Sequence, residues 1–86
     1  MKIQVRYFAS LREALGAGEA VEIGATAAGP TVATLRDTLI ARGGAHAQAL
    51  ARGRAVRCAV NQAMAEDATP IPPSAEVAFF PPVTGG

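Results

Sequence analysis

One segment with helical spacing separates two groups of short alternating segments, and this arrangement leaves few folds open to the chain. Apolar residues recur in that segment every three or four positions: Val32, Leu35, Leu39 and Ile40. The spacing predicts a helix that begins after Thr31, an N-cap residue, and ends before Gly43 and Gly44. Residues 45–51 are expected to add one or two further helical turns, with Leu50 facing inward.

The segments on either side of this helix have the spacing of strands. Residues 2–8 alternate between two faces, and they include β-branched and aromatic side chains. The same criteria predict strands at 20–23, 55–62 and 76–80, a short edge strand at 64–68, and a brief helical turn at 10–15. Pro70, Pro72 and Pro73 mark a loop before the last strand, because proline has no amide donor for a ladder.

The length and the order of elements together predict one α+β domain. A chain of 86 residues is enough for a single core, and its elements fit one sheet with a helix packed on one face. The small fold that matches this order best is the ubiquitin-like β-grasp, with a mixed sheet of four to five strands. We expect residues 1–80 to form that domain and residues 81–86 to be a flexible C-terminal tail.

Alternation along the strands predicts which side chains face the helix. The expected core face is almost wholly apolar: Ile3, Val5, Tyr7, Val21, Ile23, Val56, Cys58, Val60, Val77 and Phe79. The opposite face is polar or small except for Phe8 and Phe80, which end their strands. If these strands run parallel and side by side, the two rings lie close together and mark a protein interface. A register shift of one residue would instead bury Arg6 or Glu76, which is costly.

Charge and cysteine content exclude several kinds of site. The net charge is +1, and the densest basic group, Arg52, Arg54 and Arg57, is interpreted as a solvated loop and strand edge rather than a nucleic-acid site. Cys58 is the single cysteine and is interpreted as a structural core residue. His46, the one histidine, is expected to be exposed to solvent, and no metal site is predicted.

No membrane segment is expected. Charged residues interrupt the first six positions, unlike a signal peptide, and no apolar run is long enough to span a bilayer. The expected location is therefore the cytoplasm.

The final residues carry the most specific information about function. Pro81 and Pro82 cannot continue a ladder, so the chain has to leave the sheet there. The four residues that follow reach up to about 14 Å when extended. Gly85 and Gly86 lack a Cβ and fit a slot too narrow for other residues. A carboxylate on so slim an arm suits adenylation by ATP on a second protein, followed by displacement of AMP by a sulfur nucleophile to give a thiocarboxylate.

The ending Phe79-Phe80-Pro81-Pro82-Val83-Thr84-Gly85-Gly86 resembles the small, sulfur-carrying subunit of molybdopterin synthase, the MoaD family. Other stretches similar to that family are residues 5–9, 11–13, 31–35 and 59–62. The resemblance covers essentially the whole chain, and the tail is its most specific part. One departure is Pro73-Ser74-Ala75-Glu76, where the family usually has Gly-Asp before the Glu-Val of the last strand. It concerns the turn and not the tail chemistry.

The resemblance implies a sulfur-donating subunit rather than an enzyme on its own. Gly86 would be adenylated by an E1-like enzyme and converted to a thiocarboxylate with sulfur from a donor protein. The tail would then insert into the large synthase subunit of a heterotetramer through Pro81, Pro82, Val83, Thr84 and Gly85. There the sulfur would pass to cyclic pyranopterin monophosphate, building the dithiolene of molybdopterin.

The same resemblance implies which other residues meet the partners. Phe8, Phe80 and Arg12 would contact them. The chain would bind no cofactor itself, since ATP is used by the adenylating partner, and neither nucleic acid nor membrane is an expected partner.

The sequence leaves three alternatives open. One is a sulfur carrier for thiamine thiazole synthesis, which shares the fold and the Gly-Gly end. Another is a ubiquitin-like modifier joined through Gly86 to lysines of target proteins. The third is a binding module whose tail is chemically inert.

Overall fold

The computed structural model describes residues 1–24 and 29–82. Its elements in chain order are β1 (Lys2–Tyr7), α1 (Ala9–Leu15), β2 (Gly18–Glu22), α2 (Val32–Ile40), α3 (Gly44–Ala49), β3 (Arg57–Val60), β4 (Ala63–Ala65) and β5 (Glu76–Phe80). Each predicted element is present. The largest difference is at β3, which is shorter than the predicted 55–62 because Asn61 and Gln62 form the turn into β4, with φ of 48° and 70°. Two consecutive positive φ values are typical of a tight two-residue hairpin.

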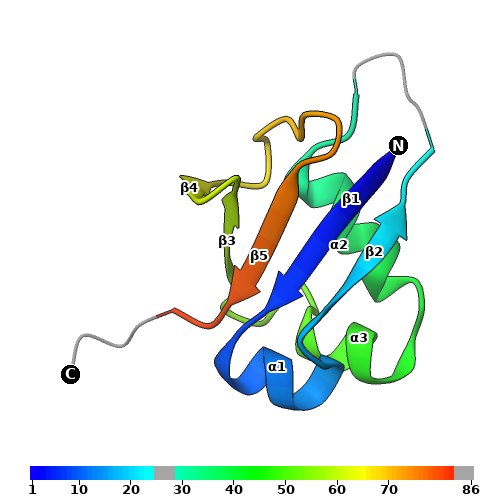
Figure 1. Ribbon diagram of the computed structural model, residues 1–86. Coiled ribbons are helices and arrows are strands. Elements are labelled where there is room, and N and C mark those ends of the chain that lie inside the picture. Colours follow the sequence, from blue (N-terminus) through cyan, green and yellow to red (C-terminus); the bar gives the residue numbers. More distant parts are fainter. Residues whose placement is uncertain (25–28, 83–86) are drawn as a thin grey trace.

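The strands of this described part form one mixed sheet in the order β2-β1-β5-β3-β4. The central strands β1 and β5 run parallel, and the other neighbouring pairs run antiparallel. Figure 1 shows the helices on one side of this sheet, with α2 crossing behind β1 and β2. The N-terminal strand and the last strand therefore lie side by side at the centre, as the predicted β-grasp requires.

The predicted core face is buried. Nine of its ten residues have burial that matches the prediction; Val56 precedes β3 and is only partly buried against the core. The helices complete the core with Leu11, Leu35, Leu39 and Leu50. The opposite face keeps Arg6 exposed, with its Nε 3.1 Å from Glu76 Oε2, so the predicted register is confirmed.

The ends of α2 follow the predicted signals. Thr31 Oγ1 accepts a hydrogen bond from the backbone N–H of Thr34 at 3.3 Å, which satisfies one free amide of the first turn. Gly43 has a φ of 76°, a conformation that glycine adopts without steric cost, and it turns the chain into α3.

The turn before β5, where the sequence departs from the family pattern, is held by backbone hydrogen bonds. Ser74 has a φ of 59°, the left-handed conformation that glycine adopts most easily. Ala75 follows and is only 1% exposed; its N–H donates to Pro72 O at 3.2 Å, and its carbonyl accepts from Gln4 N–H at 3.0 Å. The turn therefore joins the β1–β5 ladder directly, and serine bears the backbone strain.

Arg36 is a buried charge that the sequence did not reveal. It is 7% exposed, and its guanidinium donates to three backbone carbonyls: Leu50 at 2.7 Å, Ala51 at 2.7 Å and Arg54 at 3.2 Å. Burial, and secondarily the positive charge of Arg52, lower the pKa of Arg36. Because these carbonyls follow α3, Arg36 fixes the path of residues 50–54 against α2.

Candidate functional site

The described chain leaves the sheet at the end of β5. Phe80 is the last residue paired with β3, and Pro81 and Pro82 follow it, both partly buried. We call these three residues the root of the tail. The predicted tail residues Val83, Thr84, Gly85 and Gly86 lie outside the described residues.

Phe8 lies beside the root of the tail. Tyr7 pairs with Phe79 in the parallel β1–β5 ladder, and the Phe8 N–H continues it by donating to Phe79 O at 3.1 Å. Phe8 is 44% exposed, whereas Phe80 is partly buried. The parallel pairing that the prediction required is confirmed, and it places the two residues on neighbouring strands. Their contact with partners remains a prediction.

The chain turns sharply after Phe8. Ala9, the first residue of α1, has a φ of 53°, which is uncommon for a residue with a Cβ and occurs where structure is locally imposed. The turn ends β1 and leaves Phe8 outside the core. Arg12 is exposed in α1, the helix that Phe8 precedes as its N-cap residue.

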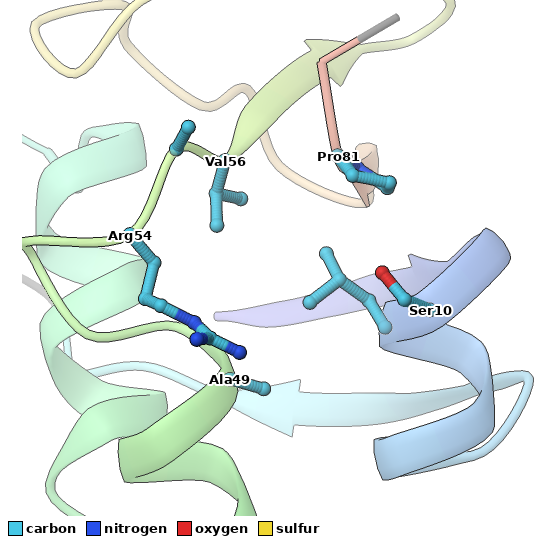
Figure 2. A pocket seen from close by; sticks show the side chains of 7 residues that line it. Ser10, Ala49, Arg54, Val56 and Pro81 are labelled. Carbon is cyan, nitrogen blue, oxygen red and sulfur yellow. The ribbon is translucent and has the colours of Figure 1, made fainter. Parts of the chain in front are cut away.

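A hollow of about 260 Å³ lies next to the root of the tail. Its walls come from three separate parts of the chain: Ser10 and Leu11 of α1, Ala49 of α3 with residues 54–56, and Pro81. Figure 2 shows the Arg54 side chain extending toward the hollow from the side of α3, with Ser10 and Pro81 on the other side. Arg54 is the one charged residue of this lining, so the hollow combines apolar walls with a positive charge.

Met64 extends the apolar part of the outer face, and the sequence analysis missed it. It is 64% exposed on β4 and pairs with Ala59 of β3, which in turn pairs with Ala78 of β5. The position of Met64 could have been predicted from the Asn61-Gln62 turn, since a two-residue hairpin puts Met64 opposite Ala59. A row of apolar side chains thus crosses the outer face near Phe80.

Cys58 is buried as predicted. It lies on the core face, and its Sγ is 3.5 Å from Ala65 O. Burial, and then the negative charge of Asp67, raise the pKa of the Cys58 thiol, which disfavours the reactive thiolate. Within residues 1–24 and 29–82 no group of three or more potential metal ligands is found.

His46 is only partly exposed to solvent and is bound to a carboxylate, so the prediction of an exposed side chain was wrong. Its side chain is 23% exposed, and Nε2 lies 2.9 Å from Glu19 Oε2. The same carboxylate accepts from the Tyr7 hydroxyl at 2.9 Å and forms an ion pair with Arg42. No local pattern in the sequence signals this Glu19 cluster, because its members come from β1, β2, the turn after α2 and α3, which meet only in the fold.

The environment of Glu19 stabilises its charged form. Burial by itself raises the pKa of Glu19, but hydrogen bonds from His46, Arg42 and Tyr7 outweigh it and lower the pKa to about 2. Burial and the neighbouring carboxylate raise the pKa of Tyr7 well above its ordinary value, so its hydroxyl remains a donor. The cluster joins β1 and β2 to the helix layer.

Comparison with known proteins places the chain in a family. The model of the ThiS family matches residues 5–86. The chain belongs to the ThiS family. The molybdopterin synthase sulfur carrier subunit of Escherichia coli is 43% identical over 84 residues, which are 98% of this chain and 99% of that protein. The resemblance found in the sequence is therefore confirmed.

Solved structures show the same fold at lower identity. Small archaeal modifier protein 1 from Haloferax volcanii has a TM-score of 0.73 at 24% identity and covers 95% of this chain and 98% of its own. A chain from the complex of subunits 1 and 2 of the molybdopterin-converting factor from Helicobacter pylori has a TM-score of 0.68 at 21% identity, with full coverage of both chains. These two similarities confirm the β-grasp fold.

The ThiS family match includes every predicted site residue, from Phe8 and Arg12 to Phe80 and Gly86. The role of each residue remains a prediction. None of the helices in residues 1–24 and 29–82 has the length and apolar character of a membrane span.

Proposed function

We propose that this chain is the sulfur-carrier subunit of a molybdopterin synthase. The observation that carries the proposal is the 43% identity, over 98% of the chain, to a molybdopterin synthase sulfur carrier subunit. The sequence adds the Phe79–Gly86 ending, and the fold adds a β5 strand that delivers it at the centre of the sheet. The thiamine and modifier alternatives have no comparable support, since the modifier protein shares only the fold with this chain.

The proposed chemistry is carried by the carboxylate of Gly86. A carboxylate oxygen attacks the α-phosphate of ATP on an adenylating enzyme, pyrophosphate leaves, and an acyl adenylate forms. A persulfide on a donor protein then attacks the acyl carbon and AMP leaves, and a thiol attacks the donor's sulfur in the resulting acyl disulfide, which releases the thiocarboxylate and a disulfide on the donor. Each transfer to cyclic pyranopterin monophosphate forms a carbon–sulfur bond, and water then hydrolyses the thioester to Gly86 and returns it to a carboxylate. Two such transfers supply the two sulfurs of the molybdopterin dithiolene. This chain supplies the arm and no cofactor.

The proposed partners are a large synthase subunit, an E1-like adenylating enzyme and a sulfur donor protein, acting in the cytoplasm. The Helicobacter pylori neighbour was solved as a complex of two subunits, which supports the large subunit as a partner. We propose a heterotetramer with two carriers. The root of the tail, Phe8 and Arg12 would surround the point where the arm enters a partner.

Intact mass spectrometry tests the carrier chemistry directly. The purified chain is incubated with ATP, the adenylating enzyme and a sulfur source, and we expect a mass gain equal to replacement of one oxygen by sulfur. Deletion of Gly86 should abolish the gain. The control Cys58→Ala should retain it, because that variant removes only the buried thiol.

The outcomes separate the alternatives. A gain equal to one added sulfur atom, rather than to oxygen replaced by sulfur, that depends on Cys58 and not on Gly86 would contradict the proposal and indicate a persulfide. Adding the large subunit and the precursor should consume the thiocarboxylate and form molybdopterin. A thiocarboxylate that is stable to that addition, but is consumed in thiazole synthesis, would favour the thiamine carrier. Covalent conjugates on lysines would favour the modifier.

A further inference from the structure

Three arginines lie around the root of the tail. Arg57 of β3 pairs with Phe80, Arg54 lines the hollow together with Pro81, and Arg12 follows Leu11, another lining residue, in α1. We call Arg12, Arg54 and Arg57 the basic rim. Arg12 is in α1, whereas Arg54 and Arg57 lie close together just before and in β3, so the fold gathers two separate parts of the sequence at the place where the tail begins.

The basic rim is not neutralised within the part of the chain that the structure describes. Arg12, Arg54 and Arg57 make no ion pair or side-chain hydrogen bond among residues 1–24 and 29–82. Arg6, Arg42 and Arg52, by contrast, are each paired with a carboxylate. Among the described residues, those that line the hollow include no acidic one. An unpaired cation beside apolar walls is suited to a carboxylate from outside the chain.

The backbone that presents Arg54 is held in place. The Arg36 guanidinium restrains this loop, because it donates hydrogen bonds to the carbonyls of Ala51 and Arg54. The Arg54 N–H donates to Ala51 O at 2.8 Å, and Arg52 pairs with Asp37 and Asp67. A positioned loop loses little conformational entropy on binding, which favours affinity.

We propose that the hollow and the basic rim bind an acidic side chain, flanked by an apolar one, on the large synthase subunit. The hollow of about 260 Å³ exceeds the roughly 30 Å³ that one water molecule occupies in the liquid, so it has room for side-chain atoms. Arg54 supplies the bidentate donor for a carboxylate, and Leu11, Val56 and Pro81 supply apolar contact. The proposal rests on the proposed function, which provides the partner.

The large subunit is the favoured occupant because a lasting complex needs more surface than the tail provides. Stable interfaces bury about 800 Å² per partner, which a short extended arm does not reach alone. The arm beyond Pro82 spans at most about 14 Å. A protein that binds the end of this arm is therefore brought against the root of the tail. The basic rim lies at that root and adds a charged contact to the apolar one from Phe8.

Calorimetric titration with the large subunit tests this inference. Arg54→Gln is expected to weaken binding about tenfold, and Arg54→Glu about a hundredfold, because the latter puts two carboxylates together. The matched control is Lys2→Gln, which removes the same charge from an exposed residue at the opposite end of β1 and should change Kd less than twofold. Thermal melting and thiocarboxylate formation at Gly86 check that each variant remains folded and competent.

The possible results separate a failure of the proposed acidic contact from a failure of the proposed carrier function. Equal weakening by Arg54→Gln and Lys2→Gln would overturn the local site in favour of a general charge effect. Unchanged binding of Arg54→Glu, with wild-type binding intact, would overturn the inference and leave the carrier function standing. A wild-type chain that forms no complex with the large subunit would overturn the partner assignment and this inference together.

Discussion

Arginines in the helix layer and arginines around the root of the tail have different surroundings. Arg36 and Arg42, both from the α2 region, are bonded to carbonyls or to the Glu19 carboxylate. Arg54 and Arg57 lie beyond α3, and the described residues offer their side chains no acidic partner. Residues of one chemical type thus occupy two distinct environments.

The difference indicates which charges hold the fold and which are available to a partner. A charge with fixed partners loses those bonds when it is mutated, so its removal is expected to lower stability. A charge on an open rim has water as its alternative partner, so its removal leaves stability nearly unchanged. The comparison therefore predicts that stability and partner affinity respond to separate sets of substitutions.

The largest expected effect on stability is at Arg36. Arg36→Met keeps a long side chain but leaves the carbonyls of Leu50, Ala51 and Arg54 without their donor, so we expect a loss of about 3 kcal/mol. Urea denaturation measures it. The control Arg57→Met should cost less than about 0.5 kcal/mol, because Arg57 is exposed. Equal losses in the two variants would remove the distinction between the two environments.

Glu19→Gln is expected to have the next largest effect. Glutamine retains the shape but loses the charge that Arg42 and His46 face, and we expect a loss of about 1–2 kcal/mol at pH 7 in the same denaturation assay. Glu22→Gln on the same strand is the control, since Glu22 is exposed and its one ion pair is with the N-terminus. A smaller loss for Glu19→Gln than for Glu22→Gln would contradict the role of the cluster.

The residues that sequence reasoning placed correctly are those governed by local pattern. Alternation found the core face of β1 and β5, and the spacing of small and capping residues found α2 with Thr31 at its start. Phe8 and Phe80 were assigned to neighbouring strands because the order of elements predicted the fold. The tail motif predicted the family that the comparisons confirm, whereas the chemistry at Gly86 remains a prediction.

The residues that were missed depend on contacts between distant segments. His46 was expected to be exposed because nothing near it in sequence binds it, and its partner Glu19 is on another strand. Arg36 was indistinguishable from an exposed helical residue, because its carbonyl partners belong to the loop after α3. Polar contacts of this kind follow from the packed fold and have no periodicity.

The pH dependence of stability is a further test of the contrast between charges that have fixed partners and charges that are exposed. The folded-state pKa of Glu19, about 2, lies below its ordinary value of 4.5, so the unfolded chain binds the proton more readily between these values. The stability that this carboxylate contributes is complete above pH 4.5 and is lost as the pH falls toward 2.

Urea denaturation of wild type and Glu19→Gln at pH 7, 4.5 and 3 tests this dependence. The difference between the two proteins should narrow as the pH falls below 4.5, because the protonated glutamate resembles glutamine. The difference between wild type and Glu22→Gln should change less, since that carboxylate is exposed. A Glu19→Gln difference that stays constant down to pH 3 would show that its charge contributes nothing.

The smallest expected effect on stability is at Met64. Its substitution tests whether binding of the large subunit to the outer face depends on charged residues alone. Met64 is exposed on β4 beside Ala59, so Met64→Gln removes apolar surface that no core residue covers, and we expect less than about 0.5 kcal/mol of lost stability. Binding of the large subunit should weaken about fivefold, equivalent to about 1 kcal/mol, if the apolar row lies in that interface. Met64→Leu keeps the apolar surface and should bind like the wild type. Equal affinity of the glutamine and leucine variants would restrict the partner contact to the basic rim and the root of the tail.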